Sequence, residues 1–194
     1  MVVVGKVVLK LTGADQKAVE AVARRLARAL RPGDVVLLFG SLGVGKTTFV
    51  RAVARALRVK DAVRSPSFTI ANVYAGPVTV QHLDLYRLDD IAAEDALALE
   101  EYVRDDAVTL VEWPEAGLER LGQARWVVRL DHESLNRRRL ELEVGDEEAA
   151  ARWEAAELQA HVNGASKNGA AAGGAPAGDA LVGGDERTSG ANLG

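Results

Sequence analysis

The spacing of apolar residues over the first 144 positions alternates between the period of a strand and the period of a helix. The valine-rich run Val2–Leu11 predicts a strand. Thr12–Asp15 resembles a helix capping box, and apolar residues then recur every three or four positions as far as Leu30, which predicts an amphipathic helix. The uninterrupted apolar run Val35–Phe39 is typical of a central parallel strand that is covered on both faces.

The rest of this region continues the alternation. One helix is predicted from about Lys46 to Leu57 and another from about Ala92 to Val103. Five further strands are predicted: Phe68–Tyr74, Val78–Leu83, Val108–Glu112, Trp126–Leu130 and Arg138–Val144. In the last two, apolar and polar residues alternate, as they do in antiparallel edge strands. The pattern predicts a three-layer α/β domain with a mixed, mostly parallel central sheet.

The last fifty residues differ from this domain. Residues 146–162 predict a helix that Asp146 caps. The segment from Asn163 onward holds nine of the 19 glycines and few apolar side chains, so burial cannot offset the entropy of ordering it. We therefore divide the chain into an α/β domain at residues 1–144, a C-terminal helix at residues 145–162 and a disordered Gly/Ala-rich tail at residues 163–194.

Composition excludes several classes of protein. Hydrophobic residues make up 48% and charged residues 27% of the chain, which is typical of a globular protein. The absence of cysteine excludes disulfide frameworks, thiolate metal sites and cysteine nucleophiles. No apolar run approaches the roughly 18 residues that span a bilayer, and the N-terminus lacks the order of a signal peptide. We therefore expect a cytoplasmic protein with no membrane partner.

The net charge of −4 is unevenly distributed along the chain. Residues 145–194 carry eight acidic and three basic side chains, so the preceding 144 residues are nearly neutral. A neutral domain offers no general electrostatic attraction for nucleic acid. Candidate chemistry therefore rests on local motifs.

The strongest motif lies between the predicted buried strand and the helix that follows it. It matches the phosphate-binding pattern G-x-x-x-x-G-K-[ST] at every defined position: Gly40, Ser41, Leu42, Gly43, Val44, Gly45, Lys46 and Thr47. The glycines let backbone amides point inward, and the positive end of the helix adds to their field. Lys46 is expected to reach the β- and γ-phosphates of a nucleotide, and the Thr47 hydroxyl to bind Mg²⁺. The motif predicts a P-loop NTPase-like fold.

Two acidic residues at strand ends are candidates for the carboxylates that such a loop requires. Asp84 follows the predicted strand Val78–Leu83, and Glu112 ends the strand Val108–Glu112. The carboxyl ends of parallel strands face the ligand crevice of an open sheet, so both are expected within reach of Mg²⁺. The alternatives are a surface acid for Glu112 and a capping or salt-bridging role for Asp84. Trp113 either covers the nucleotide or only packs against neighbouring protein side chains.

Several other polar residues receive weaker assignments. Ser67 and Thr69 lie where nucleotide hydrolases often carry a hydroxyl that senses the γ-phosphate, although on this position alone a plain turn that enters a strand is the better explanation. His82 lies in an apolar strand and is expected to be structural. The run Arg137–Arg139 is either a solvated face of a strand or the source of one contact to a nucleotide.

Two other functions remain open on the residues alone. A small-molecule kinase shares the phosphate loop but needs an acceptor site and an arginine-bearing lid, and the stretch 91–103 is acidic and aliphatic, with Arg104 alone after it. A nucleotide-gated interaction module would bind a partner only when loaded and would scarcely hydrolyse ATP. Phosphate release without an acceptor separates a hydrolase from a kinase.

Four segments, taken in order, resemble the TsaE family of bacterial ATPases needed for threonylcarbamoyl modification of adenosine in transfer RNA. The resemblance covers roughly residues 7–144, and the His-x-Asp-Leu-Tyr-Arg-Leu and Glu-Trp-Pro segments discriminate it best. The four segments run from Leu42 to Phe49, from Ser65 to Thr69, from His82 to Leu88 and from Glu112 to Glu115.

The resemblance implies roles for individual residues. Loop residues 40–48, which include Thr48, would bind ATP, and Lys46 and Thr47 would hold its phosphates and Mg²⁺. Asp84 would be the essential second-motif aspartate and a metal or catalytic group. Glu112 would be a carboxylate at the metal, with Trp113 close to the nucleotide.

The chain departs from the family pattern at three places. Ser67 stands where the family usually has threonine, which keeps a hydroxyl and loses a methyl group. Ser41 replaces the usual aspartate and removes a charge beside the phosphates. Arg137 lies near a basic position that the family places by the nucleotide.

The resemblance also implies partners. Family members are slow ATPases alone and act with TsaB and TsaD, the latter being the subunit that transfers the carbamoyl group. ATP binding and hydrolysis would return that complex to its starting state between turnovers. The nearly neutral charge of the domain agrees with a protein that does not itself bind the tRNA.

Overall fold

The computed structural model of this chain describes residues 5–66, 69–86 and 99–169. Within these residues the sheet has seven strands in the order β1-β7-β6-β2-β5-β4-β3. The strands are β1 (Lys6–Ala14), β2 (Val35–Phe39), β3 (Ala71–Tyr74), β4 (Thr79–Asp84), β5 (Ala107–Glu112), β6 (Trp126–Ser134) and β7 (Arg137–Val144). The helices are α1 (Gln16–Ala29), α2 (Lys46–Ala56) and α4 (Glu147–Gly169), with short 3-10 helices at Leu99–Tyr102 and Pro114–Ala116.

The sheet is mixed, as the sequence predicts. Its central strands β6, β2, β5 and β4 pair in parallel. Antiparallel strands flank them, β7 and β1 on one side and β3 on the other. The prediction that β6 and β7 lie at an edge is wrong, because β1 pairs with the far side of β7 and takes the edge position itself.

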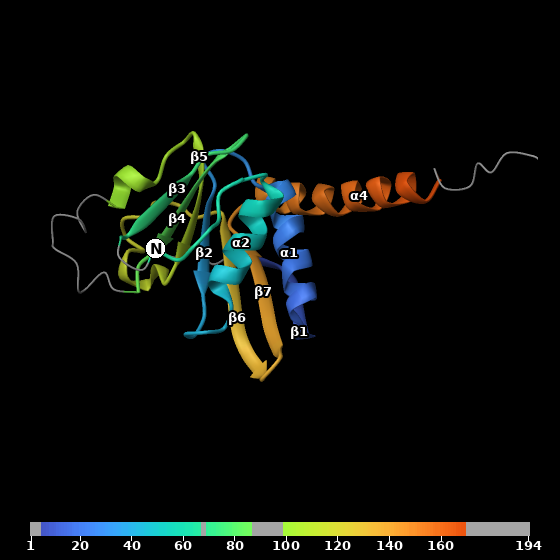
Figure 1. Cartoon of the computed structure of the whole chain (residues 1–194), viewed down its shortest axis with the longest axis horizontal. Coiled ribbons are helices and arrows are strands. Elements are labelled where there is room, and N and C mark those ends of the chain that lie inside the picture. Colours follow the sequence, from blue (N-terminus) through green and yellow to red (C-terminus); the bar gives the residue numbers. More distant parts are fainter. Residues whose placement is uncertain (1–4, 67–68, 87–98, 170–194) are drawn as a thin grey trace, which may run out of the picture.

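The two faces of the sheet are covered differently, which gives three layers (Figure 1). Alternate residues of β2 point to opposite faces: Val36 and Leu38 pack in the core beneath α1 and α2, whereas Val35 and Leu37 belong to the second core. Leu99 of the first 3-10 helix and Leu121 cover that second core. The predicted helix Ala92–Val103 lies largely outside the described residues, and its described part is the 3-10 turn Leu99–Tyr102.

Helix α1 begins where the sequence expects it, but Asp15 alone provides the cap. The Asp15 carboxylate accepts a hydrogen bond from the Ala18 amide at 2.9 Å, and Thr12 lies within β1. The buried stripe of α1 includes Val19, Val22 and Leu26, as the spacing predicts. No helix in the described ranges is long and apolar enough to cross a membrane.

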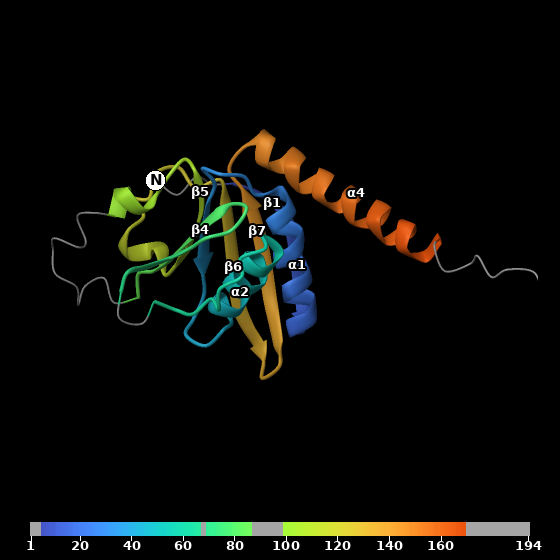
Figure 2. The same ribbon diagram turned by 45° about the horizontal axis from the view of Figure 1, so that its top comes forward.

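Helix α4 starts beside α1 and extends beyond the rest of the molecule (Figures 1 and 2). Its first turns bury Ala149, Trp153 and Ala156. The helix continues to Gly169, so the predicted end at Val162 is placed too early. A single glycine costs a helix only about 1 kcal/mol, and Gly164 therefore does not end it. Residues 170–194 of the predicted tail lie outside the described part.

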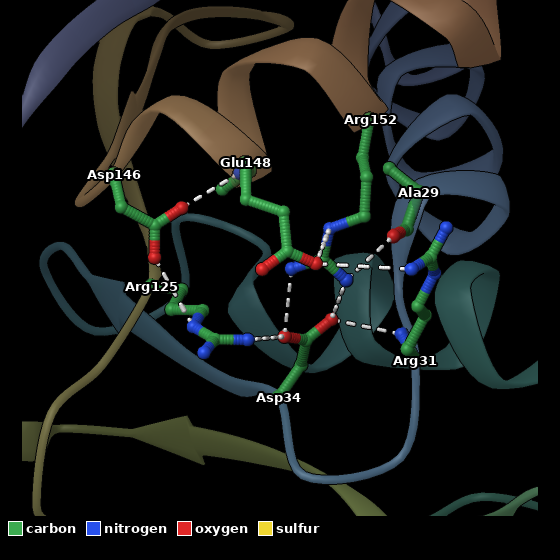
Figure 3. A network of polar contacts seen from close by, with 8 residues as sticks. Ala29, Arg31, Asp34, Arg125, Asp146, Glu148 and Arg152 are labelled. Atoms are coloured by element: carbon green, nitrogen blue, oxygen red, sulfur yellow. Dashed lines mark hydrogen bonds and ion pairs between the residues drawn. The ribbon is translucent and has the colours of Figure 1, made fainter.

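A buried ion pair fastens α4 to the start of β2 (Figure 3). Arg152 donates to both carboxylate oxygens of Asp34, at 2.8 and 3.1 Å, and to the Ala29 carbonyl at 3.2 Å. The Arg31 amide donates to the same carboxylate at 2.8 Å. Asp34 and Arg152 are both buried, so each charge is compensated most directly by the other. Arg125, 3.8 Å from Asp34, and Glu148, 3.8 Å from Arg152, extend the network.

Candidate nucleotide-binding site

The glycine-rich loop connects the carboxyl end of β2 to the amino end of α2, as the motif requires. Gly45 is the residue before α2 and has φ of 115°, a value that favours glycine. A Cβ atom at Gly40 would collide with the Leu130 carbonyl oxygen, so the loop can pass β6 only with glycine there. Gly45 has no side chain to cap α2, which leaves the first-turn amides of the helix for an anion.

Lys46 is folded back onto its own loop. Its Nζ donates to the carbonyl oxygens of Gly40 and Ser41, at 2.6 and 3.1 Å. The same nitrogen lies 3.5 Å from the centre of the Trp113 ring, a cation–π contact. Burial lowers the pKa of Lys46 below its ordinary value, and the carboxylates of Glu112, Asp84 and Glu115 oppose that shift in part. An anion bound here would meet a positive charge that lacks a direct carboxylate partner among the described residues.

The two predicted acids lie side by side at the carboxyl ends of neighbouring strands. Asp84 of β4 and Glu112 of β5 are directly paired in the parallel register. Glu112 is buried, and its Oε2 accepts a hydrogen bond from the Thr47 hydroxyl at 3.0 Å. The structure therefore brings the threonine of the loop and one acidic strand end into direct contact.

Asp84 makes different contacts from Glu112. Its carboxylate accepts hydrogen bonds from the Ser65 hydroxyl at 2.7 Å and from the Tyr86 amide at 3.3 Å. Asp84 is half-buried at the strand end and contributes to the field at Lys46. Ser67 lies outside the described residues, and the exposed Thr69 donates to the Ala71 carbonyl at 3.3 Å.

Trp113 forms an aromatic wall beside Lys46. It adopts φ of 55°, an uncommon value for a residue with a side chain, immediately after β5 ends. Its ring centre lies 4.8 Å from that of Tyr86, which follows β4. The left-handed backbone turns the indole back over the loop, so Trp113 contacts the candidate site itself.

Arg138, rather than the predicted Arg137, contacts the loop. Arg138 donates from Nε to the Val44 carbonyl at 2.8 Å, whereas Arg137 donates to the Gly13 carbonyl at 2.9 Å. Neighbouring residues of a strand point to opposite faces, which explains why the two arginines make different contacts. A contact between Arg137 and a nucleotide stays a prediction.

A cavity of about 490 Å³ lies beside the loop. Gly43, Val44, Gly45 and Thr48 form one wall. The start of α1 and the turn between β6 and β7 form the others, through Asp15, Gln16, Lys17, Val19, Leu135, Asn136 and Arg138. Of the remaining loop residues, Ser41 and Leu42 are exposed.

The donor set fits a magnesium ion that is shared with phosphates. Mg²⁺ prefers hard oxygen ligands and usually takes one or two from carboxylates, with the rest from phosphates and water. Thr47 and Glu112 provide a hydroxyl and a carboxylate oxygen 3.0 Å apart. In the described residues no group of three or more acidic or histidine side chains forms a metal cage. Lys46 and the open amides of α2 complete an arrangement that can hold a polyphosphate.

The fold and the site define a mixed α/β protein with a phosphate-binding loop. A sequence model described as "Threonylcarbamoyl adenosine biosynthesis protein TsaE" matches residues 13–140. This chain therefore belongs to the TsaE family.

Individual relatives agree with this assignment. A tRNA threonylcarbamoyladenosine biosynthesis protein TsaE from Bacillus subtilis is 41% identical over 118 residues, which are 60% of this chain and 73% of that protein. The protein of the same name from Streptomyces coelicolor is 44% identical over 119 residues, with coverage of 56% and 75%. The crystal structure of YdiB from Bacillus subtilis superposes with a TM-score of 0.66 and 29% identity, and covers 79% of this chain and 97% of that chain.

Proposed function

We propose that this chain binds ATP and hydrolyses it with Mg²⁺ as one component of the machinery that makes threonylcarbamoyladenosine in tRNA. The contact between Thr47 and Glu112 carries this proposal, because it joins the phosphate loop to an acidic strand end at 3.0 Å. Membership of the TsaE family supplies the pathway. The same membership supports a location in the cytoplasm and TsaB-like and TsaD-like proteins as partners. In this proposal the partners, rather than this chain, contact the tRNA.

Each site residue has a role in this proposal. The amides of the loop and of the first turn of α2 bind phosphate oxygens, and Lys46 leaves its two loop carbonyls to neutralise charge on the transferring group. Thr47 and Glu112 would hold Mg²⁺, which would neutralise charge on the phosphates. Asp84, already held by Ser65 and the Tyr86 amide, orients the attacking water.

The cavity beside the loop offers a place for the nucleoside. Gly45 and Thr48 in its wall adjoin the helix end where the phosphates would bind. Its lining is mixed: Asp15, Asn136 and Arg138 are among its polar side chains, and Val19, Val44 and Leu135 are apolar. Its volume of about 490 Å³ lies in the usual range for small-ligand sites.

Arg104 argues against the kinase alternative. Its guanidinium is exposed and donates to both carboxylate oxygens of Asp106, at 2.8 and 2.5 Å. An arginine engaged with its own neighbour is poorly placed to close over a phosphate. We therefore favour hydrolysis over phosphoryl transfer to a small molecule.

Reconstitution of tRNA modification tests the proposed function. In a mixture that lacks only this component, we expect threonylcarbamoyladenosine to form for about one turnover and then stop, and the full chain to restore repeated turnover. A non-hydrolysable ATP analogue should fail to restore it. Full restoration by the analogue would instead support a nucleotide-gated binding module, and no effect of the chain would contradict the family role.

Fluorescence of Trp113 provides a direct test of nucleotide binding. ATP phosphates should draw the Lys46 ammonium from its position 3.5 Å from the indole, which changes the environment of that ring. The other tryptophans, Trp126 and Trp153, are fully buried and lie outside the site. We expect MgATP to change the emission of the wild-type chain with a saturable dependence and to leave Trp113→Phe unchanged. The same change in both chains would place its origin elsewhere.

A further inference from the structure

His82 is buried in the middle of β4, yet one ring nitrogen reaches the candidate metal carboxylate. The side chain is fully inaccessible to solvent, and its Nε2 lies 2.8 Å from Oε1 of Glu112. Residues 82 and 84 of a strand share a face, and the register pairs Asp84 with Glu112. His82 therefore lies directly behind the two acids, on the interior side of the site.

The Glu112 carboxylate is held from two directions. Oε1 contacts His82 and Oε2 accepts from the Thr47 hydroxyl at 3.0 Å. An ionised carboxylate only accepts hydrogen bonds, so the His82 Nε2 carries the hydrogen and donates it. This contact fixes the rotation of the carboxylate about its last bond and keeps Oε2 directed at the loop.

Packing alone does not account for a histidine at this position. The neighbours Val80 and Leu83 on the same strand are apolar and fully buried. The second ring nitrogen, Nδ1, is buried without a hydrogen-bond partner among the described residues. An unpartnered buried polar atom costs free energy, and an apolar side chain would avoid that cost. The only polar contact that the structure describes for this ring is the one to Glu112.

We propose that His82 is a positioning residue for the metal site, which acts by holding Glu112 in the orientation that binds Mg²⁺. The proposal rests on the proposed function, because Glu112 must bind the metal for its orientation to matter. His82 does not touch the nucleotide or the metal itself. Groups that orient a metal ligand in this way typically contribute 10–100-fold to metal affinity.

The test measures binding of ADP to the full chain by titration calorimetry, with Mg²⁺ and with EDTA. His82→Leu removes the N–H and keeps an apolar side chain of similar size. His82→Gln returns an amide N–H close to the position of Nε2. We expect the Mg²⁺ affinity of the ADP complex to fall about 10–100-fold in His82→Leu and to recover within about threefold in His82→Gln. ADP binding in EDTA should be the same in all three chains.

Gln81 offers a matched control on the same strand. It is also buried, and its Oε1 accepts from the Thr109 hydroxyl at 3.2 Å on the opposite face of the sheet. Gln81→Leu should therefore disturb a buried polar contact between β4 and β5 without touching Glu112. We expect its Mg²⁺ dependence to match the wild type, even where its melting temperature falls as far as that of His82→Leu.

The outcomes separate the two proposals. A wild-type chain that binds no ADP in either condition refutes the proposed function, and the role of His82 falls with it. A wild-type chain that binds MgADP, together with equal Mg²⁺ dependence in His82→Leu, overturns the role of His82 alone. If His82→Leu does not fold, His82→Asn replaces it in the test. The asparagine amide is shorter and reaches only the position of Nδ1, so it cannot donate to Glu112 as Nε2 does. Loss of Mg²⁺ affinity in His82→Asn but not in His82→Gln supports the proposal, and equal affinities overturn it.

Discussion

Replacement of Lys46 by alanine is expected to slow phosphate release by at least 10²–10³-fold, the loss that follows removal of one preorganised donor to a developing charge. Lys46 is the cation of the loop, and its Nζ already lies within 3.1 Å of two loop carbonyl oxygens. Its charge is costly in the buried position, which is why burial lowers its pKa. A triphosphate would supply the counter-charge. Phosphate release by the chain within the reconstituted tRNA-modification mixture measures the effect.

Lys10→Ala is the control for this experiment. Lys10 lies on β1, is largely exposed and pairs with Glu141 at 3.1 Å. Its removal subtracts the same charge from the chain at a place remote from the loop and should leave the rate unchanged. The melting temperature of both variants must stay near that of the wild type for the comparison to hold. An unaltered rate in Lys46→Ala would defeat the assignment of the phosphate loop.

Local patterns predict the centre of this fold well. The run Val35–Phe39 has no polar residue because both faces of β2 are covered, and the structure begins and ends the strand at those residues. The loop motif is equally local, since its glycines and lysine lie within eight residues and need only a strand before them and a helix after them. The sequence therefore predicts the loop together with the strand before it and the helix after it.

Pairing between distant segments is harder to predict. The alternating pattern of Trp126–Leu130 and Arg138–Val144 indicates strands but does not say which neighbour covers them, and β1 proves to be that neighbour. A register irregularity between His132 and Ser134 near the turn shows how easily the face of a strand changes there. The sequence alone therefore does not show that Arg138, next to Arg137, is the residue that contacts the loop.

The contact between His82 and Glu112 could not be predicted from the sequence either. His82 and Glu112 are 30 residues apart, and only the register of β4 against β5 brings the ring to the carboxylate. The interpretation of His82 as structural followed from its apolar neighbours alone. A histidine two positions before Asp84 shares a face with that acidic strand end, and this spacing is a local signal that could have placed His82 near the site.

Replacement of Asp34 by alanine is expected to lower the free energy of unfolding by about 3–5 kcal/mol, because the buried Arg152 charge then loses its closest counter-charge and keeps, among the described residues, only Glu148, 3.8 Å from its Nε. Arg152 donates to both oxygens of Asp34, and both side chains are almost fully buried (Figure 3). The pair joins α4, which lies outside the matched residues 13–140, to the start of β2. Urea denaturation followed by circular dichroism measures the change. Lys10→Ala, at an exposed pair, should alter the same quantity by only about 0–1 kcal/mol.

A double variant shows whether the two charges act as a unit. Arg152→Met alone should destabilise the chain for the reciprocal reason, since the Asp34 carboxylate then stays buried with fewer donors. In Asp34→Ala combined with Arg152→Met neither charge is left alone, so the loss should be clearly smaller than the sum of the two single losses. Additive losses would mean that each residue stabilises the fold through its other contacts, such as those to the Arg31 amide and the Ala29 carbonyl. A loss in Asp34→Ala no greater than that of Lys10→Ala would show that the pair does not hold α4 in place.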